Sequence, residues 1–527
     1  MAYIGQVAPL PLGDEGLTGN KNLSQVRPTQ LLKANAITYE NGTLQKEPGT
    51  TLYTPSAIDS GASILAGWDW WPLSGVQRSI VVTSNGKVLK DDGSSGSYAT
   101  TLATGLTVGG VVPVFVEAGK ENAAGDRKLF LCTGKNQVKV LAADGATMAS
   151  IATPPADWAG TTFPKAGVNH EGRFWAFQGH LGYYSNPSNH EDMSGTGSGT
   201  VAVYPGEGEE IVCAFVFGSY IIVGKQPSGI YLIDTSDPTV TNWKVQRLTR
   251  QLGLAGPLSY AVVDGDAIVI DPSGEMFTLS TITVPTDVRP SSLTQQAVFS
   301  PFIRENTGAA QYGKIQGIYY PGKRQVWFAI AGFGSSINNA RIKLDFNGQV
   351  PRFAFSTFVT CESLWLAKDA NNIPRPVAGD NAGLVRKLDQ PSRAFDGAGY
   401  QGEFQTPHVN AGQLFGDPRL GVKTMNGQFL ELVYEPTGAW DLNVSYYWDA
   451  VLEETLAYSM GAAGGAVLGT WLLGTDALGG DQVKNLQQRI TGSGRRFSLA
   501  ARNSGAGQDF SIAAAYLGVT LGAERSE

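Results

Sequence analysis

The chain has 527 residues, more than one hydrophobic core normally holds, so we expect two or three domains. Charged residues make up only 16% of the chain, glycine is abundant at 66 residues and 42% of the residues are hydrophobic, which favours a turn-rich β protein over a solvated helical one. The formal net charge of −7 argues against a surface that binds DNA by neutralising phosphates, although it suits a wall past which DNA slides.

The N-terminus, MAYIGQVAPLPLGDEG, lacks the basic region and apolar core of a signal peptide. No apolar run is long enough to cross a bilayer, so we expect a protein without a membrane segment, made in a cytoplasm. Cys132, Cys213 and Cys361 lie far apart in apolar, strand-like runs. This placement predicts three buried free thiols, and a disulfide with one cysteine left over is the alternative.

The first element is the stretch ANAITYENGTLQKEPGTTLY at residues 34–53. Two β-type runs flank Asn41 and Gly42, a pair typical of the type I′ hairpin turn, in which both central residues take positive φ. Pro48 and Gly49 are expected to form a second turn. The sequence therefore predicts an N-terminal hairpin arm over residues 1–55.

Seven hairpin-like units follow, each with an apolar run, a short turn rich in glycine, asparagine or serine, and a second run. They lie at residues 80–89, 128–141, 173–185, 220–234, 267–279, 326–346 and 376–388. Their turns are roughly 45 to 50 residues apart, except for one longer gap, which is close to the period of four-stranded propeller blades. We predict a β-propeller-like domain over residues 56–395. The blade number stays open, and a set of unrelated hairpins in β-sandwiches is the alternative.

The pattern changes near residue 400. Apolar and polar residues alternate from Trp440 to Trp448, which predicts a half-buried antiparallel strand. In DFSIAAAYLGVTL the apolar series Phe510, Ile512, Ala514 gives way to Leu517, Val519, Leu521, and this one-residue phase slip predicts a β-bulge. Residues 452–461 fit either a short helix or a strand. We therefore predict a C-terminal β-sandwich over residues 396–527 and an all-β fold for the whole chain.

No residue set predicts catalysis, a cofactor or a metal. The four histidines, His170, His180, His190 and His408, lack the close spacing of structural zinc ligands. A glycosidase needs two carboxylates that face each other across a cleft, which sequence neighbours do not provide; the acidic pairs here are Asp91–Asp92, Glu209–Glu210 and Glu453–Glu454. We therefore expect no enzyme activity.

Four arginines gather near the C-terminus: Arg489, Arg495, Arg496 and Arg502. They favour a solvated strand edge or a subunit interface over a DNA-contacting patch.

The opening segment, PLPLGDEGLTGNKNLSQVRPTQLLKANAITYENGTLQKEPGT, resembles the N-terminal signature of the tail nozzle proteins of short-tailed, podovirus-type phages, a family that includes packaged-DNA stabilisation proteins. The structural motif that carries the resemblance comprises Asn35, Asn41, Gly42, Lys46, Pro48 and Gly49, with Leu32, Ala34, Leu44 and Thr50 beside it. The family commonly has Lys-Arg before Pro-Gly, whereas Lys46–Glu47 stands here. Residues 172–189 are similar to a blade element of this family, and residues 491–525 to its closing strands.

The resemblance implies a structural virion protein of the tail, assembled in the host cytoplasm. Copies would form a homo-oligomeric ring, six to a ring, below the portal and its head-to-tail adaptor. The ring would extend the DNA channel, retain the packaged genome and allow its ejection, and DNA would pass without sequence-specific binding. Tail fibres or a needle would be further partners, and the arm with parts of the sandwich would build the ring platform.

Two other functions stay open. A propeller glycan hydrolase or depolymerase would need paired carboxylates from different blades. A glycan-binding adhesin would need exposed aromatic platforms, for which Trp243 or the pair Tyr183–Tyr184 would serve, although such residues more often belong to a blade core.

Overall fold

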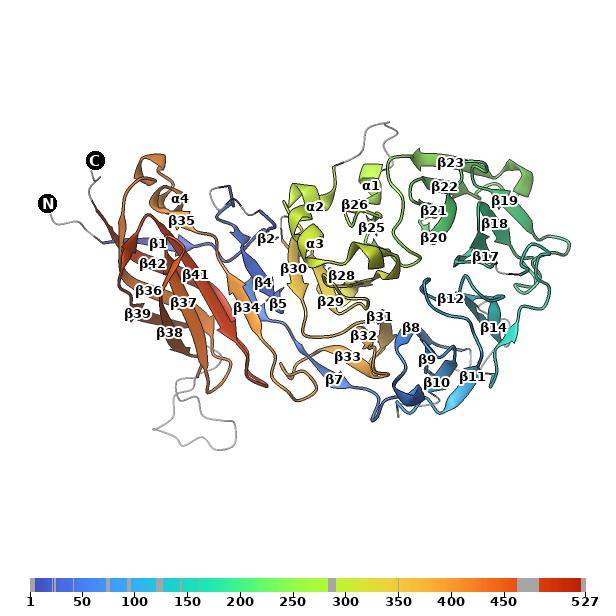
Figure 1. Cartoon of the computed structure of the whole chain (residues 1–527), viewed down its shortest axis with the longest axis horizontal. Helices are drawn as coiled ribbons and strands as arrows, with labels where there is room; N and C mark the ends of the chain where they lie inside the picture. The colour runs from blue at the N-terminus through green and yellow to red at the C-terminus, as the bar shows by residue number, and fades with distance from the viewer. Residues whose placement is uncertain are drawn as a thin grey trace.

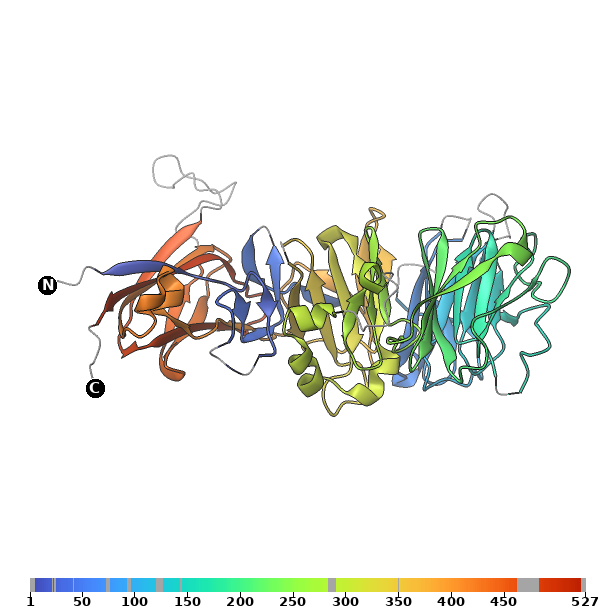
Figure 2. The same cartoon turned by 90° about the horizontal axis from the view of Figure 1, so that it is seen from above.

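The computed structural model describes residues 5–20, 22, 25–40, 42–72, 76–91, 96–119, 127–142, 145–160, 162–282, 291–348, 350–461 and 483–522. The molecule is elongated, with a propeller at one end and a second domain of two packed sheets at the other (Figure 1; Figure 2). Strands dominate, and the few helices are short. The predicted all-β fold class is confirmed.

The propeller holds seven antiparallel units around one axis, and the first four are separate four-stranded sheets in sequence order (Figure 1). A short 3-10 helix, η1 (Asp59–Gly61), precedes the first, and η2 (Val240–Asn242) lies within the fourth. The strands are β8 (Ile64–Trp70), β9 (Arg78–Thr83), β10 (Val88–Asp91) and β11 (Thr100–Ala103); β12 (Val114–Ala118), β13 (Lys128–Cys132), β14 (Lys139–Ala142) and β15 (Ala149–Ser150); β16 (Ala166–His170), β17 (Arg173–Gln178), β18 (Leu181–Tyr184) and β19 (Gly199–Ala202); β20 (Glu210–Phe217), β21 (Tyr220–Gln226), β22 (Ile230–Asp234) and β23 (Lys244–Thr249).

The last three units depart from this plan. The fifth has three strands, β24 (Tyr260–Val263), β25 (Asp266–Ile270) and β26 (Met276–Thr278), followed by α1 (Leu279–Ile282), α2 (Leu293–Gln296), α3 (Ser300–Asn306) and η3 (Ala309–Lys314). The sixth belongs to a longer sheet and comprises β27 (Gln316–Tyr320), η4 (Pro321–Lys323), β28 (Gln325–Ile330), β29 (Ala340–Asp345) and β30 (Arg352–Ser356). The seventh combines β31 (Ser363–Lys368), β32 (Pro374–Gly379) and β33 (Val385–Gln390) with β7 (Gly49–Leu52) from the N-terminal segment.

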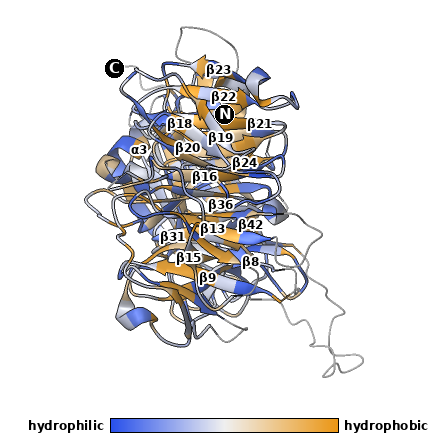
Figure 3. Cartoon of the chain, turned by 90° about the vertical axis from the view of Figure 1, so that its right-hand side faces the viewer, coloured by the Kyte–Doolittle hydropathy of each residue, from blue (hydrophilic) through white to orange (hydrophobic). Residues whose placement is uncertain are grey.

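Apolar side chains between neighbouring blades close the ring. In β9, Ile80 and Val82 pack towards the second blade, whereas Val81 packs with Trp365 of the seventh. Because the central strands of a blade are buried on both faces, their sequences read as continuous apolar runs. Apolar residues accordingly follow the strands, and the connecting loops are mostly polar (Figure 3).

All seven predicted hairpins are confirmed. Each forms the second and third strands of one unit, from β9–β10 in the first to β32–β33 in the seventh. The first and last hairpins therefore both belong to the propeller. The three cysteines are free and buried, as the sequence predicted.

The second domain contains two sheets that share one apolar core. The first, which we call the β42 sheet, contains β1 (Gln6–Leu10), β5 (Ile37–Glu40), β6 (Thr43–Lys46), β36 (Met425–Glu435), β39 (Lys484–Arg489), β40 (Ser493–Gly494) and β42 (Ser511–Leu521). The second, the β41 sheet, contains β34 (Gly402–Gln405), β35 (Val409–Asn410), β37 (Asp441–Trp448), β38 (Val451–Ser459) and β41 (Arg496–Asn503), with α4 (Ala411–Phe415) and η5 (Pro418–Leu420) at one end. Leu430 and Leu432 of β36 pack in one core with Val444 and Tyr446 of β37.

The sequence anticipated local details of this domain. The alternating run is strand β37, with Leu442 and Trp448 among its buried residues. Strand β42 contains a bulge, as predicted, but it lies at Ala513 rather than between Ala514 and Leu517, because Val433 pairs with Ala514 and Tyr434 with Ile512. The ambiguous segment at 452–461 is mainly strand, since β38 runs to Ser459.

One sheet runs through both domains. Strand β4 (Lys33–Asn35) lies between β30 of the propeller and β34 of the second domain, and Asn35 pairs with Phe355 on one side and Glu403 on the other. Strands β2 (Gly16–Leu17) and β3 (Gln30–Leu31) join the same sheet. The structure thus divides the chain differently from the predicted boundary at residue 55. Residues up to Lys46 belong to the second domain and the junction, whereas β7 belongs to the propeller, because strand pairing rather than chain order defines each unit.

Candidate functional site: the junction between the two domains

A short segment of the N-terminal region connects the two domains. We call residues 45–50 the junction strap, because the chain leaves β6 in the β42 sheet here and enters β7 in the propeller. Its backbone is bonded to three separate segments. Lys46 N donates to Phe510 O at 3.2 Å, Glu47 N to Ala36 O at 2.8 Å, and Thr50 N to Ala394 O at 2.8 Å. The strap is therefore fixed along its whole length.

The Glu47 side chain points into the sixth blade. Its carboxylate lies 2.9 Å from the Arg341 guanidinium and 2.8 Å from Lys343 Nζ, and all three side chains are at most 4% exposed. Both cations come from β29, and Lys343 also donates to Ile37 O at 3.0 Å. Although burial opposes ionisation, Arg341 and Lys343 hold the pKa of Glu47 below its usual value. Glu47 is thus an ion-paired anchor between the N-terminal segment and the propeller.

Lys46 points the opposite way, into the second domain. Its amine donates to Asn503 Oδ1 at 3.4 Å, at the end of β41, and to Gly505 O at 3.2 Å and Gln508 O at 3.1 Å in the turn that follows. The Tyr400 ring covers it, with 4.2 Å from Nζ to the ring centroid. Burial lowers the pKa of Lys46 to about 8. Neighbouring strap residues therefore bind different domains.

Arg393 ties the strap to the same turn. Its guanidinium donates to Lys46 O at 2.6 Å and lies 2.7 Å from an oxygen of the Asp509 carboxylate. Burial raises the pKa of Asp509, although Arg393 opposes this effect. Thr50 Oγ1 donates to Asp396 at 2.8 Å, and Asp396 in turn accepts from Arg386 of β33 at 2.7 Å. The segment after the seventh blade is thus part of the junction.

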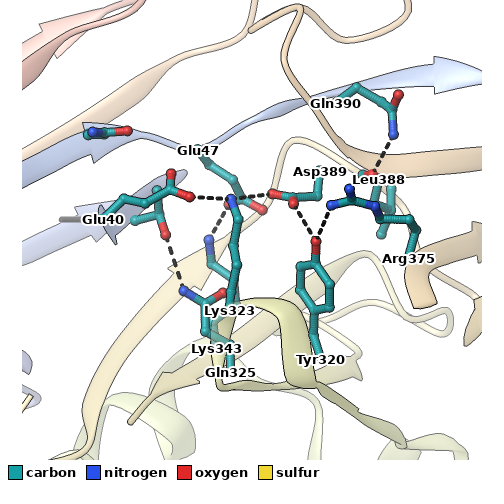
Figure 4. A network of polar contacts seen from close by, with 12 residues as sticks. Glu40, Glu47, Tyr320, Lys323, Gln325, Lys343, Arg375, Leu388, Asp389 and Gln390 are labelled. Carbon is teal, nitrogen blue, oxygen red and sulfur yellow. Dashed lines mark hydrogen bonds and ion pairs between the residues drawn. The ribbon is translucent and has the colours of Figure 1, made fainter. Parts of the chain in front are cut away.

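A second polar bridge lies beside the strap (Figure 4). Lys323 lies 3.1 Å from Glu40 of β5 and 2.7 Å from Asp389 of β33, so one amine bridges the hairpin and the seventh blade. Tyr320 donates to Asp389 at 2.9 Å and accepts from Arg375 at 2.9 Å. The β5–β6 hairpin is therefore bonded to the propeller through the ion pair of Glu40 with Lys323.

The structure brings most motif residues together at this junction. Asn35 accepts from Thr357 N at 3.2 Å, and Lys46, Pro48 and Gly49 lie in the strap. Gly42 forms the tip of the predicted β5–β6 hairpin, away from the strap, with φ of +80°. Asn41 lies outside the described residues.

The second predicted turn is wrong. Gly49 has no positive φ and begins strand β7, so Pro48 and Gly49 lead the chain into a blade rather than reversing it. A Cβ on Gly49 would lie 2.2 Å from Ala394 O, so the absence of a side chain permits this close approach. Lys46 and Glu47 are both buried, so neither presents charge to a passing ligand.

The other candidate residues are dispersed. Asp91, Glu210 and Glu454 lie in β10, β20 and β38, in three different sheets, and Asp92 lies outside the described residues. Within the described part of the chain, no group of three or more His, Cys, Asp or Glu side chains could hold a metal ion. No helix among the described segments is long and apolar enough to span a membrane.

The candidate aromatic platforms belong to blade packing. Tyr183 is buried against Trp158, with ring centroids 5.4 Å apart. Trp243 packs on Tyr184 at 5.0 Å and on Trp175 at 5.3 Å.

The four C-terminal arginines lie on the second domain: Arg489 on β39, Arg496 and Arg502 on β41, and Arg495 just before β41. Arg489, Arg495 and Arg502 are exposed.

The sequence did not identify the partners of the strap, namely Arg341, Lys343, Arg393 and Asp509. The charges of Arg341, Lys343 and Asp345 alternate with apolar residues and so look like a solvent-facing side, yet every residue of β29 is buried. The sequence offered one signal only: charged residues make up just 16% of the chain, so few charged side chains are available to cover the surface.

No family model matches the chain, and no curated protein matches it. Among solved structures, it is similar to YCF48 bound to D1 peptide, at 11% identity and a TM-score of 0.38, over 68% of this chain and 97% of that one. It is also similar to the computationally designed Ika8 protein, at 10% identity and a TM-score of 0.38, over 72% and 99%. The WD40 repeats of RRP9 match at 8% identity and a TM-score of 0.40, over 66% and 99%. At these identities the likeness concerns the fold alone.

Proposed function

We propose that the protein is the subunit of a tail nozzle ring in a short-tailed phage. In this role six copies surround a channel below the portal and its adaptor, retain the packaged genome and let it pass during ejection. The resemblance of the N-terminal motif supports this proposal, because four of its residues, Asn35, Lys46, Pro48 and Gly49, lie at the junction that joins the two domains.

The observation that carries the proposal is the sheet that runs from β27 to β38 through β4. A subunit of a pressurised conduit has to transmit load between the part that holds the ring and the part that projects from it. A continuous sheet and a buried, ion-paired strap resist bending between domains, since bending would break ladder hydrogen bonds and expose paired charges. The low charge and large β surface also suit subunit contacts.

The charge distribution agrees with a conduit that does not hold DNA. The chain is acidic overall, and the cations of the junction are paired or bonded inside the protein. A channel wall without clusters of unpaired lysine and arginine side chains would bind DNA phosphates only weakly, so that the DNA can pass. Under this proposal, the ring acts by changing the width of its DNA channel and not by a chemical reaction.

The mass and symmetry of the purified protein test this proposal. We expect light scattering and negative-stain images to show a ring, either alone or on addition of a portal–adaptor complex. Portal without adaptor serves as the control and should not recruit the protein. A monomer that ignores the adaptor would overturn the proposal, and glycan binding and hydrolysis assays would then test the adhesin and depolymerase alternatives.

A further inference from the structure

The Lys46 side chain meets a carboxamide in a closed environment. Lys46 is 0% exposed and Asn503 3%, and their Nζ and Oδ1 atoms are 3.4 Å apart. Asn503 Nδ2 donates to Gln508 Oε1 at 3.0 Å, which turns Oδ1 towards the amine. Gly402 makes room for the lysine methylenes, because a Cβ there would lie 2.7 Å from Lys46 Cγ. The two groups are held together with little freedom to separate.

From this juxtaposition we propose that Lys46 and Asn503 form an intramolecular isopeptide bond. The Lys46 amine attacks Cγ of Asn503, a C–N bond forms between Nζ and Cγ, and the bond from Cγ to Nδ2 breaks. One amine proton passes to the leaving nitrogen, so the products are a secondary amide and ammonia. The atoms balance without an oxidant, reductant or co-substrate.

The surroundings favour this reaction in three ways. Fixed proximity replaces a collision between two groups, which is the largest advantage that an intramolecular reaction has. Burial lowers the pKa of Lys46 to about 8, so a share of the amine is uncharged and nucleophilic near neutral pH. Asp509, which is ion-paired with Arg393 at 2.7 Å, also interacts electrostatically with Lys46, and under this proposal its carboxylate takes up the amine proton and passes it to the leaving nitrogen.

The bond would join the junction strap to the end of β41. Lys46 and Asn503 are 457 positions apart, so the new amide would close almost the whole chain into a covalent loop. It would fix the strap to the second domain while Glu47 and β7 fix it to the propeller. This inference does not depend on the proposed function, because it follows from the buried geometry of the two side chains and their chemistry.

Intact-protein mass spectrometry and peptide mapping test the proposal directly. We expect the wild-type protein to weigh less than its sequence by one ammonia, and a protease digest to contain a branched peptide joining Lys46 to Asn503. Lys46→Arg and Asn503→Ala should each restore the full sequence mass. Lys225→Arg is the matched control, since Lys225 is also 0% exposed but bonds to a backbone carbonyl, Tyr204 O, at 3.0 Å; this variant should keep the loss of ammonia.

Two results would overturn the proposal. The first is a wild-type protein of full sequence mass that yields separate peptides for Lys46 and Asn503. The second is a loss of ammonia confined to a linear peptide around Asn503, which would indicate a cyclic imide within that peptide. The wild-type measurement decides the question even if a variant fails to fold.

Discussion

The Glu47 carboxylate of the junction strap lies 2.9 Å from the Arg341 guanidinium of the sixth blade, and both side chains are almost fully excluded from solvent, at 2% and 1% exposure. Lys343 approaches the same carboxylate at 2.8 Å, so two buried cations share one anion. The N-terminal segment thus supplies a charge that the propeller needs. Folding of the propeller and attachment of the second domain are coupled through this residue.

We expect Glu47→Gln to be strongly destabilising. The variant keeps the shape of the side chain but leaves Arg341 and Lys343 buried without a counter-charge, which costs about 3–5 kcal/mol when a buried pair is broken. Urea unfolding followed by tryptophan fluorescence measures the loss as a lower midpoint.

Glu40→Gln is the control for this substitution. Glu40 is 33% exposed and its partner Lys323 also has Asp389 at 2.7 Å, so the loss should stay within about 1 kcal/mol. Equal effects of the two substitutions would contradict the special role of Glu47.

The stability that Glu47 provides should depend on pH. Its two cations hold its pKa below the usual value in the folded protein, so the unfolded chain binds a proton first as the pH falls. The contribution is therefore complete above the ordinary pKa of a glutamate and is lost as the pH falls through the folded-state value. We expect the difference in urea midpoint between wild type and Glu47→Gln to be constant near neutrality and to shrink in acid. A difference that grows in acid would have the wrong sign.

Gly49→Ala should weaken the closure of the propeller. The new Cβ would lie 2.2 Å from Ala394 O and 2.5 Å from Ala394 N, so β7 would have to move away from the segment that follows its partner strand β33. Overpacking of this kind costs about 1–3 kcal/mol. Thermal unfolding should show a lower midpoint, and limited proteolysis should cut faster near β7. Gly5→Ala is the matched control, because nothing lies within 4 Å of its added Cβ, and it should behave as wild type.

Two N-terminal truncations should differ sharply. Removal of residues 1–10 deletes only β1, which pairs with β42 at the far side of the second domain, so the propeller should stay folded. Removal of residues 1–53 deletes β4, β5, β6 and β7 together, which leaves the seventh blade without its outer strand and the long sheet divided. Circular dichroism and size-exclusion chromatography would distinguish a folded protein from an expanded one. A folded propeller after the longer truncation would refute the closing role of β7.

The sequence by itself determined the local units of this protein. The β5–β6 hairpin, the seven blade hairpins, the alternating strand β37 and the presence of a bulge in β42 all follow from signals that span a few residues, namely turn chemistry and apolar periodicity. Gly42 takes φ of +80°, as its place in the predicted turn requires. These signals act between neighbours in the chain, so they can be read from the sequence without knowledge of the fold.

Only the tertiary structure decided how these units are joined. The pairing of β7 with β33 and of β4 with β30 and β34 links segments that are hundreds of residues apart, and no local pattern records such a choice. For the same reason, the sequence did not predict the contacts of the junction strap. From the sequence, Arg341 and Lys343 look like charged side chains that face water, but burial between the two domains pairs both with Glu47. Pro48–Gly49 likewise looks like a turn, but Gly49 begins the extended strand β7. The physical reason is that burial and ion pairing depend on which surfaces meet, and that is settled only when the whole chain has folded.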